Sequence, residues 1–273
     1  MGYLSCVLSD RKVAAATRVL GCVAILLSVV PSAKAALFAV DTTQDVLYQV
    51  NPATGAVTAI GTTALSGLAT PGGLAWDGTS MYTIDLEGGE LFTLDLATGT
   101  PTLIGTNGIN GWQGLAARPT DGALFAVNQS NTLYSINKTT GAATAIGGGT
   151  GNLITALTFD AGGVLWGINF SNGQFGTIDT TTGAFSVVGT TNSGVQGLSF
   201  DSVGTAYVSN TNTDSLYTLD LGTGTATLVG AMTGTTFVKA IEFADGGAVP
   251  EPGSIALVGL GAMGLAVLRM RKG

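Results

Sequence analysis

The chain has 273 residues and a formal net charge of −7, and only 10% of its residues are charged. It contains no histidine, which excludes histidine general bases, Ser-His-Asp triads and the usual zinc sites. Its two cysteines, Cys6 and Cys22, precede the expected start of the mature chain, so the body has no disulfide. The abundance of glycine, threonine, alanine and valine favours sheets joined by tight turns.

The charge is distributed unevenly along the chain. Residues 36–248, which we call the body, contain three basic and fifteen acidic residues, so the body has a net charge of −12. Such a field repels nucleic acid and anionic lipid headgroups, so we predict no nucleic-acid partner. The remaining cations gather at the two ends of the chain.

The N-terminus has the layout of a secretory signal peptide. A basic stretch precedes the apolar run 19–30, and the small residues Ala33 and Ala35 then mark a cleavage site before Ala36. We therefore predict a signal peptide over residues 1–35 and a mature chain that begins at Ala36. The alternative is an uncleaved membrane anchor, for which the apolar run is short.

The C-terminus combines three features in a fixed order. The first is an extended, accessible segment held by two prolines, which consists of Val249, Pro250, Glu251 and Pro252. An apolar run follows at 255–268, and it is shorter than the roughly twenty residues that comfortably span a bilayer. The last is a basic tail that favours the cytoplasmic side of a membrane, made of Arg269, Arg271 and Lys272.

This three-part tail, residues 249–273, resembles the PEP-CTERM sorting signal, which a membrane-embedded exosortase recognises and processes. The resemblance implies export, an exosortase-type enzyme as a partner, and a transient anchor in the inner membrane through a short transmembrane helix. It also implies a final position at the cell surface or outside the cell. An ordinary short tail anchor is the alternative, and neither interpretation describes the body.

The body repeats at intervals of about forty-two residues. An Asx-x-x-Thr-Gly segment occurs five times, with spacings of 44, 42, 42 and 41 residues, at 51–55, 95–99, 137–141, 179–183 and 220–224. The Asx side chain can bond the backbone two residues on, and glycine takes the positive φ that closes a hairpin. The short apolar runs on both sides of each copy are therefore expected to be paired strands.

Two further strands are expected in each repeat. One usually bears an aromatic residue, at 37–40, 81–84, 124–127, 165–168 and 206–209. The other begins with a small residue, at 73–76, 114–117, 156–159, 197–200 and 240–243. Four short strands in forty-odd residues are the signature of a propeller blade.

The order of the strands predicts how the ring closes. The chain opens at Leu37 on a second strand, and it ends at 240–243 on an innermost strand with no blade after it. Pairing these two segments completes a fifth blade and removes an open edge. We therefore predict an all-β fold, a five-bladed β-propeller of four-stranded blades over residues 36–248. This body resembles the NHL and YVTN-type repeat propellers; a β-sandwich or β-solenoid is the alternative.

The candidate ligand-binding site lies near the propeller axis, where several blades converge. The residues just before the innermost strands form a polar collar with one cation: Gly72, Gln113, Thr155, Gln196 and Lys239. Trp112 beside the collar could stack on a sugar or cap the core between blades. Glu242 is a lone acid where the other innermost strands have small residues, and it has no obvious second carboxylate at glycosidase distance.

The loops after the second strands carry carboxylates of the kind that bind calcium: Asp41, Asp45, Glu87, Glu90 and Asp214. None of these loops has the dense acidic spacing of a calcium site, so we predict solvated turn carboxylates, no metal and no cofactor. Asp or Asn residues also recur after the second strands of other blades, at Asp85, Asn128, Asn169 and Asn210. Their recurrence indicates turn chemistry rather than catalysis.

Two functions follow from these features. The favoured one is an exported, non-catalytic surface or matrix protein whose propeller is a binding or structural module, with extracellular polysaccharide as the ligand. The alternative is a propeller hydrolase or lyase acting on glycans, which requires two acids near the axis roughly 5–10 Å apart. Ice binding would need a flat threonine face, and the threonines here fall largely in turns.

Overall fold

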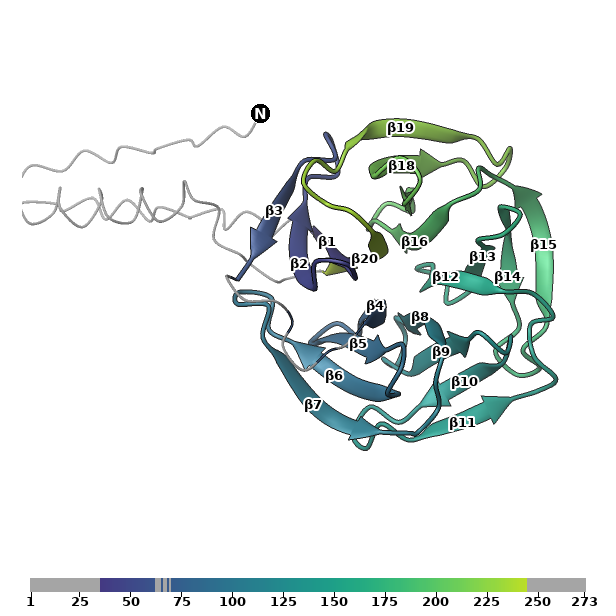
Figure 1. Ribbon diagram of the computed structural model, residues 1–273. Helices are drawn as coiled ribbons and strands as arrows, with labels where there is room; N and C mark the ends of the chain where they lie inside the picture. The colour runs from purple at the N-terminus through teal and green to yellow at the C-terminus, as the bar shows by residue number, and fades with distance from the viewer. Residues whose placement is uncertain (1–34, 62–64, 66–67, 69, 245–273) are drawn as a thin grey trace, which may run out of the picture. The chain divides into compact units, whose positions relative to one another are not determined.

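The computed structural model describes residues 35–61, 65, 68 and 70–244. In this part of the chain, twenty strands form five four-stranded antiparallel sheets that surround an axis as blades (Figure 1). Residues 1–34 of the predicted signal peptide and the whole predicted tail lie outside the described residues. No helix among the described residues is long and apolar enough to cross a membrane.

Each blade has an innermost strand, two middle strands and an outer strand. The first blade holds β20 (Val238–Ala244), β1 (Ala36–Asp41), β2 (Val46–Val50) and β3 (Val57–Ile60). The second holds β4 (Pro71–Trp76), β5 (Met81–Asp85), β6 (Glu90–Leu94) and β7 (Pro101–Thr106), and the third holds β8 (Trp112–Ala117), β9 (Leu124–Asn128), β10 (Leu133–Ile136) and β11 (Ala143–Ile146). The fourth holds β12 (Ile154–Phe159), β13 (Leu165–Asn169), β14 (Gln174–Ile178) and β15 (Phe185–Thr190), and the fifth holds β16 (Val195–Phe200), β17 (Ala206–Asn210), β18 (Ser215–Leu219) and β19 (Ala226–Ala231). The predicted five-bladed propeller with four strands per blade is therefore confirmed.

The strand β20 closes the ring. It pairs antiparallel with β1, with Ala36 opposite Ala244 and Leu37 opposite Phe243, as predicted. The innermost strands are neighbours in the order β4, β8, β12, β16, β20 and back to β4. Every blade and the closing contact lie within residues 36–244, so this span contains the whole described fold and is expected to fold by itself.

The repeated turns have the predicted chemistry. In all five copies the Asx carbonyl accepts the backbone N–H of the glycine four residues later, at 2.7–2.8 Å. The five glycines take positive φ angles between 73° and 76°. Glycine adopts this conformation most readily, and a Cβ at Gly55 or Gly224 would collide with a backbone oxygen of the neighbouring blade, which explains why glycine ends the repeat.

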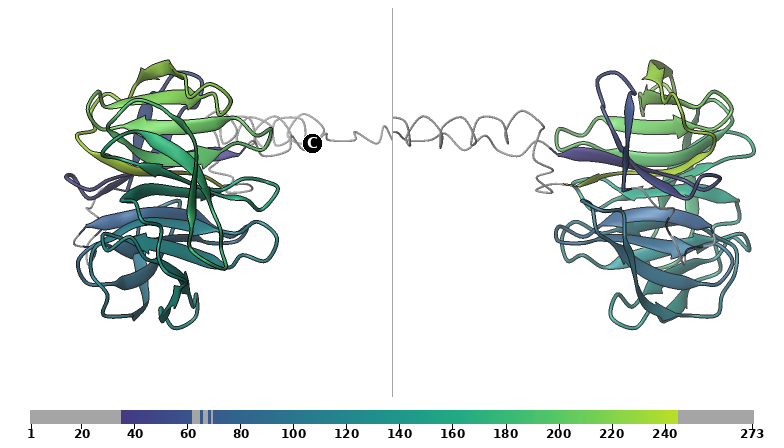
Figure 2. Two further views of the ribbon diagram at one scale, coloured as in Figure 1. Left: turned by 90° about the vertical axis from the view of Figure 1, so that its right-hand side faces the viewer. Right: turned by 60° about the vertical axis from the view of Figure 1, so that its left-hand side comes forward.

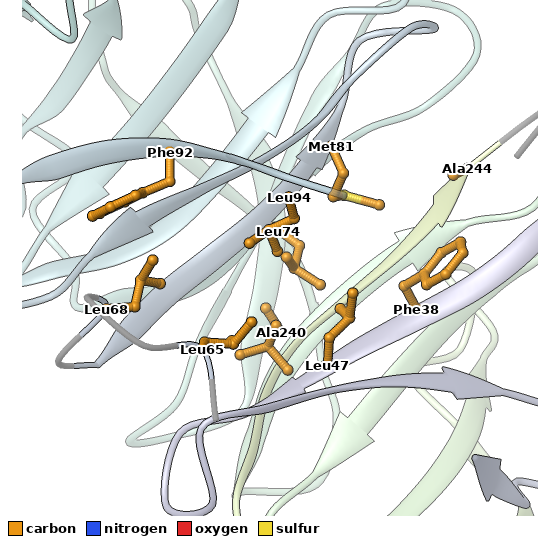
Figure 3. Close-up of a cluster of buried hydrophobic side chains, with 11 residues drawn as sticks. Phe38, Leu47, Leu65, Leu68, Leu74, Met81, Phe92, Leu94, Ala240 and Ala244 are labelled. Atoms are coloured by element: carbon orange, nitrogen blue, oxygen red, sulfur yellow. The ribbon is translucent and has the colours of Figure 1, made fainter. Parts of the chain in front are cut away.

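The hydrophobic core is spread around the ring, between neighbouring blades. Figure 3 shows the cluster between the first and second blades, where Phe38 and Leu47 face Leu74, Met81 and Leu94. Three edge-to-face aromatic pairs join later blades in the same way, between a second strand and the innermost strand of the next blade: Phe125–Phe159, Trp166–Phe200 and Tyr207–Phe243. The repeated aromatic positions of the sequence are therefore contacts between blades.

The outer strands carry no charged residue, although edge strands are often protected by charge. Two of them, β3 and β11, are only four residues long. The other three, β7, β15 and β19, each pair with the third strand through a shifted register. Short strands and bulges both make an edge a poor template for another chain, so geometry replaces charge at this rim.

The connections between strands lie on two opposite faces, which can be followed in the side views of Figure 2. The repeated Asx-x-x-Thr-Gly turns lie on one, which we call the turn face. The connections from second to third strands, and those that enter the innermost strands, lie on the other, the loop face. Because β1 starts and β20 ends at the turn face, both ends of the propeller leave from it.

Candidate functional site

Each innermost strand has a β-bulge at the same position. In β4 the pairing with β5 passes from Pro71 directly to Gly73, and the other four innermost strands skip one residue at the equivalent place. The skipped residues are the predicted collar: Gly72, Gln113, Thr155, Gln196 and Lys239. Since a bulge re-aims the side chain of the extra residue, the fold presents one residue from every blade at a single level of the axis.

Lys239 joins the collar across the ring. Its ammonium donates hydrogen bonds to Gln113 Oε1 at 2.6 Å and to Gln196 Oε1 at 3.1 Å. These contacts connect the first blade with the third and the fifth. The side chain of Lys239 is 5% exposed, and burial lowers its pKa to about 8. None of the ion pairs in the described part of the chain includes Lys239.

The axis at the collar holds a cavity of about 10 Å³. Its lining includes Gln113, Thr155 and Gln196, followed by the small and aliphatic residues of the innermost strands. Pockets for drug-sized ligands occupy about 300–1,000 Å³, so a sugar does not fit on this axis. The structure brings the collar residues together, but the space that they enclose has about the size of one water molecule.

Trp112 lies in the core rather than at a ligand surface. Its side chain is fully buried, and its ring meets Tyr134 edge-on with the ring centroids 5.0 Å apart. This arrangement corresponds to the alternative in which Trp112 caps the core between blades, since Trp112 belongs to a buried cluster that includes Ile84 and Leu91 of the second blade. A sugar has no access to either face of the ring in this conformation.

Glu242 lies on the axial strand β20, below the collar. Its Oε1 accepts the backbone N–H of Trp76 at 3.2 Å, and its Oε2 accepts the Ser199 hydroxyl at 3.1 Å. Glu242 is the sole acid on the five innermost strands. The carboxylate pair that a hydrolase or lyase would need is therefore not present on those strands, and the observed contacts of Glu242 connect neighbouring blades.

Asp41 is a buried carboxylate that links two loops. It accepts backbone N–H groups of Thr43 and Gln44 in its own turn, and of Thr236 and Phe237 in the loop that enters β20. Burial by itself raises the pKa of Asp41, but the four backbone hydrogen bonds outweigh it and leave the pKa lowered. This carboxylate is therefore occupied by the fold and is not available as a metal ligand.

The equivalent residues of the other blades have the same role. Each side-chain oxygen accepts a backbone N–H from the turn that follows, in Asp85, Asn128, Asn169 and Asn210. These bonds confirm that the recurring Asp and Asn residues stabilise turns. Where the residue is Asn169 or Asn210, its amide N–H also donates to the loop that enters an innermost strand, at Asn152 or Ser193.

The carboxylates considered for calcium are spread over separate turns. Among the described residues, no group of three or more acidic, histidine or cysteine side chains could hold a metal ion. Asp45 and Asp214 occupy left-handed turn positions, with φ angles of 53° and 44°. The corresponding residues of the other blades, Gly89, Asn131 and Gly173, also have positive φ. The turn conformation therefore explains the choice of Asp, Asn or Gly at this position.

An open hollow of about 430 Å³ lies on the loop face, between the second and third blades. It is lined by Leu86, Glu87, Asn110, Gly111 and Gln129, and the side chains of Glu87, Asn110 and Gln129 are exposed. Gly111 connects the three loops, because its N–H donates to the Leu86 carbonyl and its own carbonyl accepts the Gln129 N–H. Sequence reasoning missed this set because its members lie on three loops outside the repeated motif.

A variant of Lys239 tests the electrostatics of the collar. The unfolded chain keeps the Lys239 proton up to the ordinary pKa of 10.5, whereas the folded chain loses it near pH 8. Between these values the unfolded state binds more protons, so burial of Lys239 makes stability rise with pH by about 3 kcal/mol from pH 7 to 10.5. We expect the free energy of unfolding of Lys239→Met, measured by urea denaturation in halide-free buffer, to lack this rise with pH. Tyrosine titration is common to both proteins, so parallel pH profiles would contradict the prediction.

This geometry defines the chain as a five-bladed β-propeller protein, and solved structures share the fold. A structure from a study of the de novo evolutionary emergence of a symmetrical protein is 20% identical, with a TM-score of 0.54 over 76% of this chain and 97% of that chain. A chain of a nidogen/laminin complex is 15% identical, with a TM-score of 0.57 over 77% and 98%. Virginiamycin B lyase from Staphylococcus aureus is 11% identical, with a TM-score of 0.44 over 67% and 65%. The first two similarities show the fold alone, and the third supports no argument.

The C-terminal tail gives more specific information about the protein than the fold does. Residues 248–272 match the PEP-CTERM protein-sorting motif, so the predicted sorting signal is confirmed. The chain therefore carries a PEP-CTERM sorting motif in addition to its propeller body, and the motif implies export and sorting by an exosortase. No curated protein matches the chain.

Proposed function

We propose that the mature propeller is a non-catalytic binding module at the cell surface or in the extracellular matrix, with neutral exopolysaccharide as its ligand. The observation that carries this proposal is the combination of a sorting motif at 248–272 with a propeller whose open loop-face hollow is polar. The motif supports a position outside the cytoplasm. The hollow supports recognition of hydroxyl groups, because it offers hydrogen-bonding side chains without paired catalytic carboxylates.

The route to that position includes a membrane-bound stage. We propose that the signal peptide, residues 1–35, is removed before Ala36, and that the apolar run 255–268 holds the chain in the inner membrane as a short helix. An exosortase then processes the segment around Pro250–Pro252. A body held through its C-terminal end is held at the turn face, where β20 ends, and its loop-face hollow lies on the opposite side.

The charge of the body selects the class of polysaccharide. Residues 36–248 carry three cations against fifteen acids, a net charge of −12, which repels acidic polymers and leaves neutral ones unaffected. Glu87 supplies acceptors, and Asn110 and Gln129 supply both donors and acceptors, as adjacent sugar hydroxyls require. Two other hollows of about 430 and 490 Å³ lie on the turn face, from which both ends of the propeller leave.

A glycan array with the purified span 36–248 tests the binding role. We expect binding to neutral polysaccharides, and we expect the double variant Asn110→Ala/Gln129→Ala to bind about tenfold more weakly, since two hydrogen bonds are lost. The matched control is Asn192→Ala/Ser193→Ala, which removes exposed polar groups from the loop face of another part of the ring. Absence of binding to every glycan would reject the proposed ligand. Equal binding by both double variants would reject the hollow as its site.

A further inference from the structure

The collar has more hydrogen-bond donors than acceptors. An ammonium can only donate, so Gln113 and Gln196 must turn their Oε1 atoms toward Lys239. The amide N–H groups of both glutamines and the third N–H of Lys239 then make no hydrogen bond within the described part of the chain. The buried Thr155 hydroxyl is also without a partner there. The collar therefore presents several polar hydrogens, and of these groups the Thr155 hydroxyl is the one that is buried without a partner in the described part of the chain.

No carboxylate in the described part of the chain forms an ion pair with the positive charge of the collar. Lys239 is almost completely buried, and burial is the cause of its lowered pKa, with no carboxylate contributing. Glu242 on the same strand binds Trp76 and Ser199 instead. Burial of an unpaired cation is unfavourable, and an anion beside it offsets that penalty.

The axial cavity lies within reach of these groups. Its lining includes Gln113, Thr155 and Gln196, and the Lys239 ammonium is one hydrogen bond away from two of these side chains. A volume of about 10 Å³ is close to the space that one water molecule needs. The size excludes phosphate, sulfate and the carboxylate of a sugar acid, whereas a monatomic ion can enter.

We propose that this cavity binds one monatomic anion, which is chloride under ordinary solution conditions. The Thr155 hydroxyl and the amide N–H groups of Gln113 and Gln196 are its ligands, and Lys239 supplies the compensating charge. These four residues belong to the third, fourth, fifth and first blades, so the anion connects most of the ring at its centre. The site goes beyond the proposed function, because it does not depend on which ligand the loop face binds.

Thermal unfolding of the span 36–248 at constant ionic strength tests this proposal, with chloride exchanged for acetate. An anion that binds only the folded state raises the melting temperature with its concentration, by about 5 °C between millimolar chloride and 300 mM. We expect Thr155→Val and Lys239→Met to lose this dependence. Thr158→Val, which changes a buried threonine on the same strand outside the collar, should keep it.

Two outcomes of the thermal experiment would overturn the site. One is an equal melting temperature of the wild type in chloride and acetate, and the other is a chloride dependence that survives in Thr155→Val. If Lys239→Met does not fold, the threonine pair alone decides the question. Bromide anomalous scattering from a crystal gives an independent readout: a peak at the axis beside Thr155 supports the proposal, and a water molecule in bromide-containing solution rejects it.

Discussion

Ending the chain at Phe237, before β20, is expected to abolish folding of the propeller. The lost strand contributes buried side chains to two clusters between blades: Val238, Ala240, Ile241, Phe243 and Ala244. Its removal also leaves β1 without its partner and uncovers β4 and β16, which pack on β20 from both sides. Burial of one large apolar side chain contributes about 1.5–3 kcal/mol to the free energy of unfolding. The net free energy of unfolding of a whole domain is only about 5–15 kcal/mol. Loss of one innermost strand therefore exceeds what the ring can tolerate.

Far-UV circular dichroism and thermal unfolding would measure this effect. A chain that covers residues 36–248 is the matched control, and it should unfold in one cooperative transition. We expect the shorter chain, 36–237, to show no such transition and to associate, because the uncovered β1 edge can pair with another chain. A monomer with an unchanged transition would show that closure by β20 is dispensable.

Replacing Pro250, Glu251 and Pro252 by alanine is expected to block processing almost completely in the cell. Proline disfavours helix and alanine favours it, so the substitution is expected to remove the extended backbone that the sequence predicts for this segment. Glu251 is the only charged residue in the segment between Asp245 and Arg269. The sorting enzyme would therefore lose both the extended backbone and the carboxylate that mark the site.

Immunoblots of membrane and released fractions, with antibody against the propeller, would follow this change. The variant should accumulate as a full-length form in the membrane fraction. Gly246→Ala/Gly247→Ala, which lies just before the motif, is the control and should be processed like the wild type. Equal processing of the triple-alanine variant would show that another part of the tail is recognised.

Most of the candidate site was predictable as a list of residues but not as an arrangement. The collar positions follow from the repeat, since each precedes an innermost strand, and Lys239 is its single cation. The sequence left open whether Trp112 is accessible, because its burial depends on Tyr134 of the same blade and on a cluster that includes Ile84 and Leu91 of the second blade. The hollow formed by Glu87, Asn110 and Gln129 was missed because its three loops have no common pattern.

Short sequence motifs were sufficient to predict the propeller architecture and the sorting signal of this protein. The Asx-x-x-Thr-Gly turns and the period of about forty-two residues predict the blades, because hairpin turns and the pairing of consecutive strands are short-range. The strand left without a partner at each end of the repeats then predicts closure into a ring of five blades. The sorting tail is likewise a contiguous motif. Long-range packing alone decided how the axis is filled: bulges in five separate strands bring Lys239 to Gln113 and Gln196, and burial there changes its pKa. Desolvation and convergence depend on neighbours far apart in the chain, so only the folded ring defines them.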